Sequence, residues 1–292
     1  MQRKIIQQSA TSMGISLPSK WCRKWGLKKG DILEIDDSEA ILAVSPAATP
    51  VSREITLTIA DTAESGIRTL VINAYRAGYD KIILSYAGDK AMLSHIVDRY
   101  MLGFELFTDR NTYIIESVAE PSKDDFEKIA LKQIQILMEM VRNLSSDITE
   151  NFYRLRNYDN FLKRIITKYS LFSKEQGFIW QFLSTLVHIG TECFALNQHT
   201  KKFSKDELSF IAEIEQSLGL LQAAYLKKNV AFLLDLHGSE KKAAKSMALK
   251  LFKNKDPLIG YHLLTVSHQI YLSTSPLAGF IQTNTFSAPS GI

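Results

Sequence analysis

Basic side chains gather at the start of the chain, where together they could hold a polyanion. Residues 1–30 contain seven lysines and arginines and no aspartate or glutamate, and the first acid is Asp31. The net charge of the 292-residue chain is only +4, so the rest of the chain carries −3 (+4 less the +7 of this block). A local basic patch on a folded module is typical of a surface that binds nucleic acid. The seven residues are Arg3, Lys4, Lys20, Arg23, Lys24, Lys28 and Lys29.

Other residue types suited to chemistry do not form a familiar arrangement. His262 and His268 lie six residues apart, so on a helix they would not share a face as metal ligands four apart would. The sequence has no His-Glu-x-x-His motif, no Gly-x-Ser-x-Gly motif and no glycine-rich phosphate loop. We therefore expect no enzyme and no catalytic residue. Four further side chains could form a site, although acids at this density on helices are usually surface residues: His188, Glu192, Glu213 and Glu215.

Cysteine content and hydropathy bear on the cellular compartment of the protein. Two cysteines, Cys22 and Cys193, cannot build a disulfide framework, and both lie in apolar helical patterns, so we expect them to be buried. The longest apolar stretch, residues 178–196, is interrupted by polar and charged side chains and should not span a bilayer. No apolar signal segment follows the first basic residues. These features predict a cytoplasmic protein that does not insert into membranes.

The basic block is carried by a small β-rich unit at residues 1–46. Alternating apolar residues predict strands, and Pro18 and Gly26 stand where a short helix would begin and end. A unit this small lies at the lower limit of what folds alone, so we expect it to dimerise. The predicted order is strand 4–8, strand 13–17, helix 18–25, strand 31–35 and strand 40–44.

The remaining chain predicts a multidomain α+β protein that is mostly helical. Residues 53–119 alternate strands and helices, as a small α/β domain would, with helices expected at 63–76 and 89–100 and a hairpin at 104–118. Residues 122–284 have helical periodicity, with three helices followed by three more, which indicates a duplicated three-helix bundle. The second set of three is expected at 205–236, 239–252 and 257–283, with a kink at Pro276.

The N-terminal unit resembles a known DNA-binding family. The run Arg3-Lys4, Gln7, Ser16-Leu17-Pro18, Trp21, Gly26-Leu27 and Gly30-Asp31 is similar to SpoVT/AbrB domains, in the archaeal form that precedes PhoU domains. In that family two chains interleave hairpins into one barrel, and basic residues of the first hairpin and the helix face DNA. Cys22 stands where many members have the first arginine of a pair. The DNA-facing residues expected from charge, turn composition and this resemblance are Arg3, Lys4, Gln7, Ser9, Thr11, Ser12, Lys20, Arg23 and Lys24.

The helical region resembles the PhoU domain. His188-Ile-Gly-Thr-Glu192 stands where PhoU proteins have an Arg-Ile-Gly-Asp-His stretch. That resemblance implies carboxylates four residues apart that hold metal clusters. Here Thr191 replaces the aspartate, and Asp159 is the one acid kept on the preceding helix. We therefore expect no metal or other cofactor, and we expect Asp159 to be a solvated helix residue.

Charge, architecture and resemblance together predict a homodimeric DNA-binding transcriptional regulator of phosphate uptake. The barrel would contact duplex DNA, and the helical region would act as a sensor or assembly surface, in contact with a phosphate transporter or its kinase. The alternative is a phosphate-signalling adaptor that dimerises through the barrel and docks to a transporter or kinase without specific DNA binding. An enzyme ranks third, because no residue pattern supports one.

Overall fold

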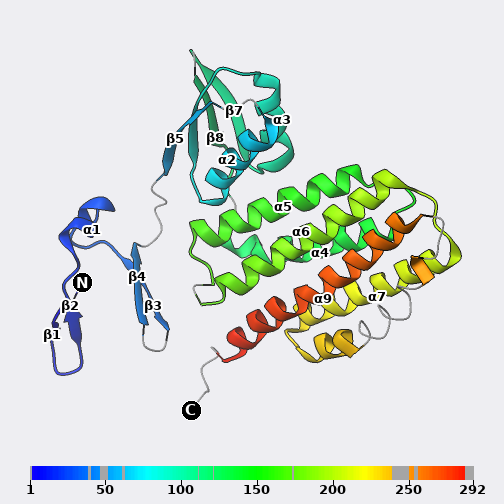
Figure 1. Ribbon diagram of the computed structural model, residues 1–292. Coiled ribbons are helices and arrows are strands. Elements are labelled where there is room, and N and C mark those ends of the chain that lie inside the picture. The colour runs from blue at the N-terminus through cyan, green and yellow to red at the C-terminus, as the bar shows by residue number, and fades with distance from the viewer. Residues whose placement is uncertain are drawn as a thin grey trace. The chain divides into compact units, whose positions relative to one another are not determined.

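A computed structural model of the protein shows a mostly helical chain with small sheets, a mixed α+β structure (Figure 1). It divides into two compact units, Met1–Ser52 and Arg53–Ile292. The structure describes residues 2–38, 41–46, 52–60, 63–110, 112–120, 122–172, 174–238, 250–252 and 256–286. No sheet formed by these residues closes into a barrel.

The first unit consists of two separate hairpins and one short helix. Strands β1 (Ile5–Gln7) and β2 (Met13–Ile15) pair antiparallel with Ile5 opposite Ile15. Pro18 is the N-cap of α1 (Ser19–Lys24), and Gly26 has the positive φ of 64° that lets the chain leave the helix. Strands β3 (Leu33–Ser38) and β4 (Ile41–Pro46) form the second hairpin. Strand β3 runs three residues further than predicted, because its end pairs in register with the start of β4, with Ser38 opposite Ile41. Residues 39–40 lie outside the described residues.

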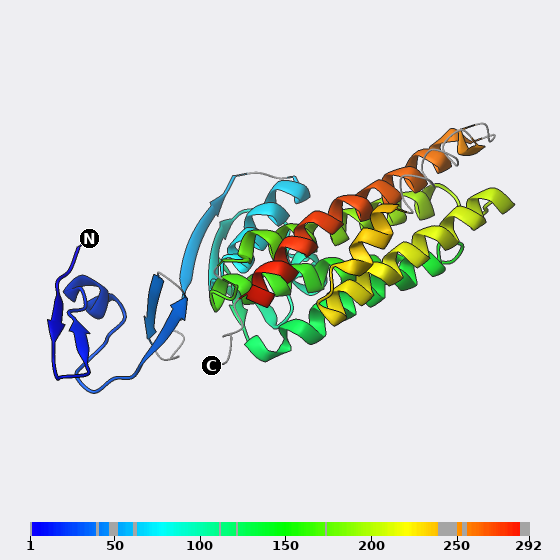
Figure 2. The same ribbon diagram turned by 90° about the horizontal axis from the view of Figure 1, so that it is seen from below.

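A four-stranded sheet begins the second unit. Its strands are β5 (Glu54–Ile59), β6 (Lys81–Tyr86), β7 (Phe104–Asp109) and β8 (Thr112–Ser117), in the order β5-β6-β8-β7. Helices α2 (Glu64–Arg76) and α3 (Lys90–Tyr100) cover the face on which Ile82, Leu84 and Ile115 are buried (Figures 1 and 2). Strand β5 is parallel to β6, with α2 as the crossover, and the other pairs are antiparallel.

The remaining long helices of the second unit follow a short 3₁₀ turn, η1 (Lys123–Asp125). They are α4 (Phe126–Arg142), α5 (Thr149–Lys168), α6 (Gln176–His199), α7 (Lys205–Lys227) and α9 (Pro257–Phe286). Helices α4, α5 and α6 pack on one another, α7 packs on α4 and α9, and α9 packs on α6. None of the helices described is both long and apolar enough to cross a bilayer.

The predicted helix over 205–236 is broken in the structure. Helix α7 ends at Lys227, and Lys228 has a left-handed φ of 48°. The Ala231 N–H then donates to Asn229 Oδ1 at 2.9 Å, and residues 231–238 form a new helix. An asparagine side chain that caps a new helix competes with continuation of the old one, which helical periodicity does not reveal. The predicted helix over 239–252 lies mostly outside the described residues, whereas α9 agrees with the prediction for 257–283 and contains Pro276.

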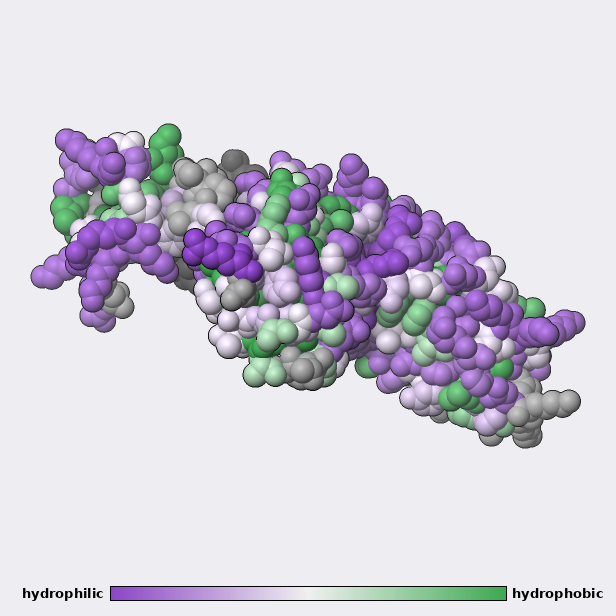
Figure 3. Space-filling view, turned by 90° about the horizontal axis from the view of Figure 1, so that it is seen from above, coloured by the Kyte–Doolittle hydropathy of each residue, from purple (hydrophilic) through white to green (hydrophobic). Residues whose placement is uncertain are grey.

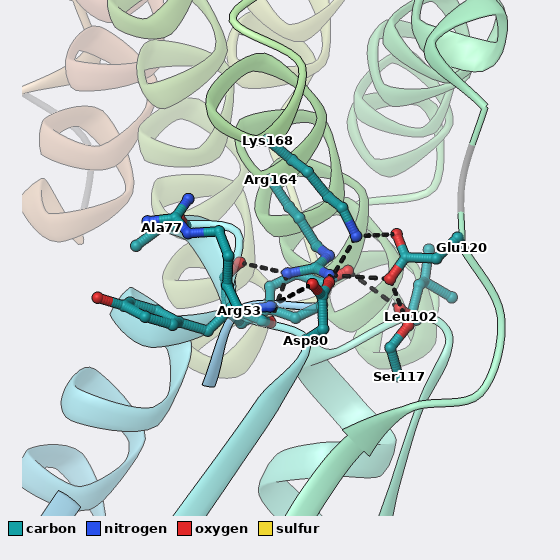
Figure 4. A network of polar contacts seen from close by, with 10 residues as sticks. Arg53, Ala77, Asp80, Leu102, Ser117, Glu120, Arg164 and Lys168 are labelled. Carbon is teal, nitrogen blue, oxygen red and sulfur yellow. Dashed lines mark hydrogen bonds and ion pairs between the residues drawn. The ribbon is translucent and has the colours of Figure 1, made fainter. Parts of the chain in front are cut away.

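Buried ion pairs join the sheet to helix α5 (Figure 4). The guanidinium of Arg164, which is fully buried, pairs with Asp80 at 2.5 Å and Glu120 at 3.0 Å, and it donates to the Tyr79 carbonyl at 2.7 Å. Lys168 pairs with the same two carboxylates at 2.5 and 2.7 Å. Burial raises the pKa of Asp80, but the hydrogen bond from Lys168 and the other donors outweigh it and hold that pKa below its ordinary value. These contacts tie residues 53–119 and the helices into one unit.

Candidate nucleic-acid interface

The first hairpin holds the predicted hydroxyl donors at its turn. The backbone N–H groups of Gln8 and Ser9 both donate to the Ser12 carbonyl, at 2.9 and 3.2 Å. The Thr11 N–H donates to Ser9 Oγ at 3.4 Å, so Ser9 partly serves the turn itself. Gln7, Ser9, Thr11 and Ser12 are all exposed. The turn is therefore built by local hydrogen bonds and leaves these side chains accessible.

Helix α1 presents three basic side chains on one face. Lys20, Arg23 and Lys24 are spaced i, i+3 and i+4, which places them together, and all three are exposed. Arg23 Nε donates to the Ser19 carbonyl at 3.4 Å, and Lys24 Nζ lies 5.5 Å from the centre of the Trp25 ring. Trp21 and Trp25 are only partly exposed, so the helix is amphipathic despite its six residues.

The structure brings the basic residues together but not the turn hydroxyls. Continuing the register of β1 and β2 puts Lys4 opposite Ser16, two residues before Pro18 and α1. Arg3 and Lys4 therefore lie at the same end of the hairpin as α1 (Figure 1). Ser9, Thr11 and Ser12 lie at the opposite end, at the turn. The predicted set thus forms a basic cluster at one end and a hydroxyl-rich tip at the other.

The charge of this unit is available to an external anion. All seven basic side chains of residues 1–30 are exposed. None of the seven forms an ion pair with a carboxylate within the part of the chain that the structure describes. The nearest acid in sequence, Asp31, accepts the Lys28 backbone N–H at 2.6 Å. A basic surface without paired acids is suited to phosphate contacts.

The same unit has exposed apolar faces. Where the structure describes the burial of its side chains, they are exposed or partly exposed, and none is buried. Ile5, Met13 and Ile15 share one face of the first hairpin and are 72%, 68% and 52% exposed. Ile35 and Leu42 share a face of the second hairpin and are 61% and 56% exposed. Figure 3 shows such hydrophobic side chains beside hydrophilic ones in the left part of the view.

Exposed apolar faces of this kind are typical of surfaces that pack against another surface. Burying an aliphatic side chain of this size contributes about 1.5–3 kcal/mol to stability, and the unit alone gains little of this free energy because these side chains stay exposed. The sequence indicates apolar strands, but it does not show which side chains stay open. The alternation of apolar residues in 5–7 and 13–15 is the available signal, and only the pairing register assigns them to one face.

The prediction for Asp159 is wrong. Its side chain is buried, and its carboxylate pairs with Lys163 at 2.8 Å and with Arg76 at 3.0 Å. Helix α5 packs against α2 there, so Arg76 reaches a carboxylate 83 residues away in sequence. An acid already paired with two cations is poorly suited to bind a metal ion.

The other metal-ligand candidates lie in separate contacts. Glu192 bonds to His262 Nδ1 at 2.9 Å, and Glu215 pairs with Arg142 at 2.5 Å. His188 is exposed, and Glu213 is only partly exposed. The described residues hold no cluster of three or more histidine, cysteine or acidic side chains that could hold a metal.

No protein-family model, curated protein or solved structure matches this chain. The likeness to SpoVT/AbrB and PhoU proteins therefore rests on the sequence motifs of residues 3–31 and 188–192.

Proposed function

We propose that this protein is a homodimeric transcriptional regulator whose first unit binds duplex DNA. The observation that carries the proposal is a unit whose seven basic side chains are all exposed and unpaired with acids in the described part of the chain. Each lysine or arginine that contacts a phosphate releases counterions and strengthens binding. The one longer acid-free stretch of the sequence, residues 257–292, contains no lysine or arginine. A shorter acid-free stretch, residues 241–255, carries six lysines and lies mostly outside the described residues.

The open apolar faces support the dimer. Two copies that interleave their hairpins, as SpoVT/AbrB domains do, would cover the Ile5, Met13 and Ile15 face and the Ile35 and Leu42 face. Dimerisation would also present the basic cluster twice about a two-fold axis. That arrangement fits the paired half-sites of duplex DNA.

The helical region serves in this proposal as the sensor or assembly surface. Its support is the PhoU-like sequence pattern and the packing of α4, α5 and α6 on one another. By that likeness the regulated process is phosphate uptake, and the partners are a phosphate transporter or its sensor kinase.

A band-shift titration of duplex DNA at several salt concentrations tests DNA binding. We expect the double variant Arg23→Ala, Lys24→Ala to weaken binding by about tenfold or more and to lower the salt slope by about 0.9 for each phosphate that the variant no longer neutralises. Lys201→Ala with Lys202→Ala is the matched control, because it removes two exposed charges after α6 and should leave binding unchanged. Wild-type protein that shows no salt-sensitive duplex binding at low salt would refute the proposal.

The apolar faces also support the second candidate, a dimeric adaptor. Such a protein would dimerise through the same hairpins and dock to a transporter or kinase without specific DNA binding. Sedimentation as a dimer, combined with no salt-sensitive band shift, would favour this alternative.

A further inference from the structure

Arg156 on helix α5 is a partly exposed arginine that has no acidic partner among the described residues. Its guanidinium carbon lies 5.2 Å from the centre of the Tyr100 ring and 5.5 Å from that of Phe152. Within the described residues it forms neither a hydrogen bond nor an ion pair. An arginine carries five N–H donors, so all five of Arg156 remain for solvent or a ligand.

Two arginines of helix α2 lie near Arg156 and have donors without partners among the described residues. Arg76 contacts Asp159 and Asn160, three and four residues after Arg156 on α5. The Arg68 guanidinium lies 5.5 Å from the Tyr100 ring centre, and only its Nη1 is engaged, by Glu64 at 2.6 Å. Arg76 uses Nε and Nη2 for contacts with α5 and leaves Nη1 without a partner among the described residues. The Arg68 and Arg76 side chains are 25% and 29% exposed, so solvent reaches both.

Positive charge exceeds negative charge where α2 packs on α5. Burial lowers the pKa of Arg156 and outweighs the opposing effects of Tyr100 and Asp159, and the nearby charges of Arg68 and Arg76 lower this pKa further. Among the described residues, the acids in contact with these cations are Glu64, paired with Arg68, and Asp159, which Arg76 shares with Lys163. Within that part of the chain, the four cations Arg68, Arg76, Arg156 and Lys163 therefore face two carboxylates, an excess of two positive charges. Partial burial weakens solvent screening and makes an added anion more favourable.

We propose that Arg68, Arg76 and Arg156 form an anion-binding site between α2 and α5 for a phosphate group, either free phosphate or a phosphate ester of a small molecule. The planar donor fork of arginine matches two oxygens of a tetrahedral oxyanion. A phosphate group carries about two negative charges near neutral pH, which balances the excess. The site lies within the Arg53–Ile292 unit and does not rest on DNA binding by the first unit.

A purely structural role for Arg156 makes a different prediction. Its guanidinium lies over two rings, and a packing role needs only side-chain contact with those rings. Arg156→Met keeps an apolar side chain beside the rings and removes every hydrogen-bond donor. Under a packing role this variant changes stability alone, whereas under the proposal its phosphate affinity falls.

Isothermal titration of the full chain with inorganic phosphate, at constant ionic strength set with chloride, tests the site. We expect phosphate to bind wild-type protein at millimolar concentration or below, and Arg156→Met to bind at least about tenfold more weakly. Arg154→Met is the matched control, because Arg154 is exposed on the same helix, and its affinity should equal that of wild type. A parallel titration with glucose 6-phosphate shows whether the site prefers free phosphate or a phosphate ester. Binding of either one supports the site.

Two results would overturn the inference. One is wild-type protein that binds neither phosphate nor glucose 6-phosphate at millimolar concentration. The other is Arg156→Met that binds as wild type does. If Arg156→Met fails to fold, Arg68→Met provides the same comparison on helix α2, and unchanged affinity in that variant equally rejects the site.

Discussion

Replacing Arg164 by methionine should destabilise the Arg53–Ile292 unit by about 3–5 kcal/mol, the usual cost of breaking a buried ion pair from one side. Arg164 is fully buried and is held by two carboxylates and by the carbonyls of Tyr75 and Tyr79, at 3.2 and 2.7 Å. In the variant, Asp80 and Glu120 keep Lys168 alone as their cation. The Tyr75 carbonyl keeps the Gly78 N–H at 3.0 Å, and loss of the charged donor to the Tyr79 carbonyl is part of the stated cost. Methionine fills most of the space of the stem, so the cavity contribution stays small.

The assay is urea unfolding followed by far-ultraviolet circular dichroism, because all the long described helices belong to this unit. A destabilisation of this size also lowers Tm by about 10 °C in a unit of this length. Arg154→Met, an exposed change of the same type, should alter the free energy of unfolding by less than about 0.5 kcal/mol. An Arg164→Met destabilisation below about 1 kcal/mol would refute the reasoning that these ion pairs join the sheet to α5.

Two further predictions concern the first unit and the cysteines. Ile5→Asp with Ile15→Asp should convert a dimer into monomers in sedimentation experiments, because two charges would enter the covered face. A dimer that persists in this variant would show that the face is not the interface. Burial raises the pKa of Cys193 to about 12, so this thiol should not react with a thiol reagent near neutral pH in the folded protein. Cys22 is partly exposed, so one thiol per chain should react before denaturation and two after it, and two reactive thiols in the native protein would contradict this.

Local elements of the second unit could be predicted from the sequence. The helices expected at 63–76 and 89–100 correspond to α2 and α3, and the hairpin expected at 104–118 corresponds to β7 and β8. These predictions succeed because one face of each element is buried, so the period of apolar residues reports the element directly. The break at Lys228 escapes this signal, because apolar spacing continues across it while Asn229 caps a new helix.

The candidate interface was predictable in composition but not in arrangement. Seven basic residues without an acid are visible in the sequence, and their exposure is a property of the folded unit. The sequence groups the turn hydroxyls with the basic residues, whereas the pairing register separates them along the hairpin. DNA binding by the nine residues stays a prediction.

The sequence by itself determined where helices and strands form and where positive charge concentrates, because both depend on residues within a few positions of one another. Only the tertiary structure decided which charges are neutralised. Asp159 and Arg164 can be buried because Arg76 and Asp80, more than 80 residues away on other elements, meet them in the fold. Arg156 has no ion pair among the described residues for the same reason, since the packing of α2 on α5 brings arginines near it while the nearby Asp159 carboxylate pairs with Arg76 and Lys163. Pairings over such separations leave no periodic signal in a single sequence, so only the fold reveals them.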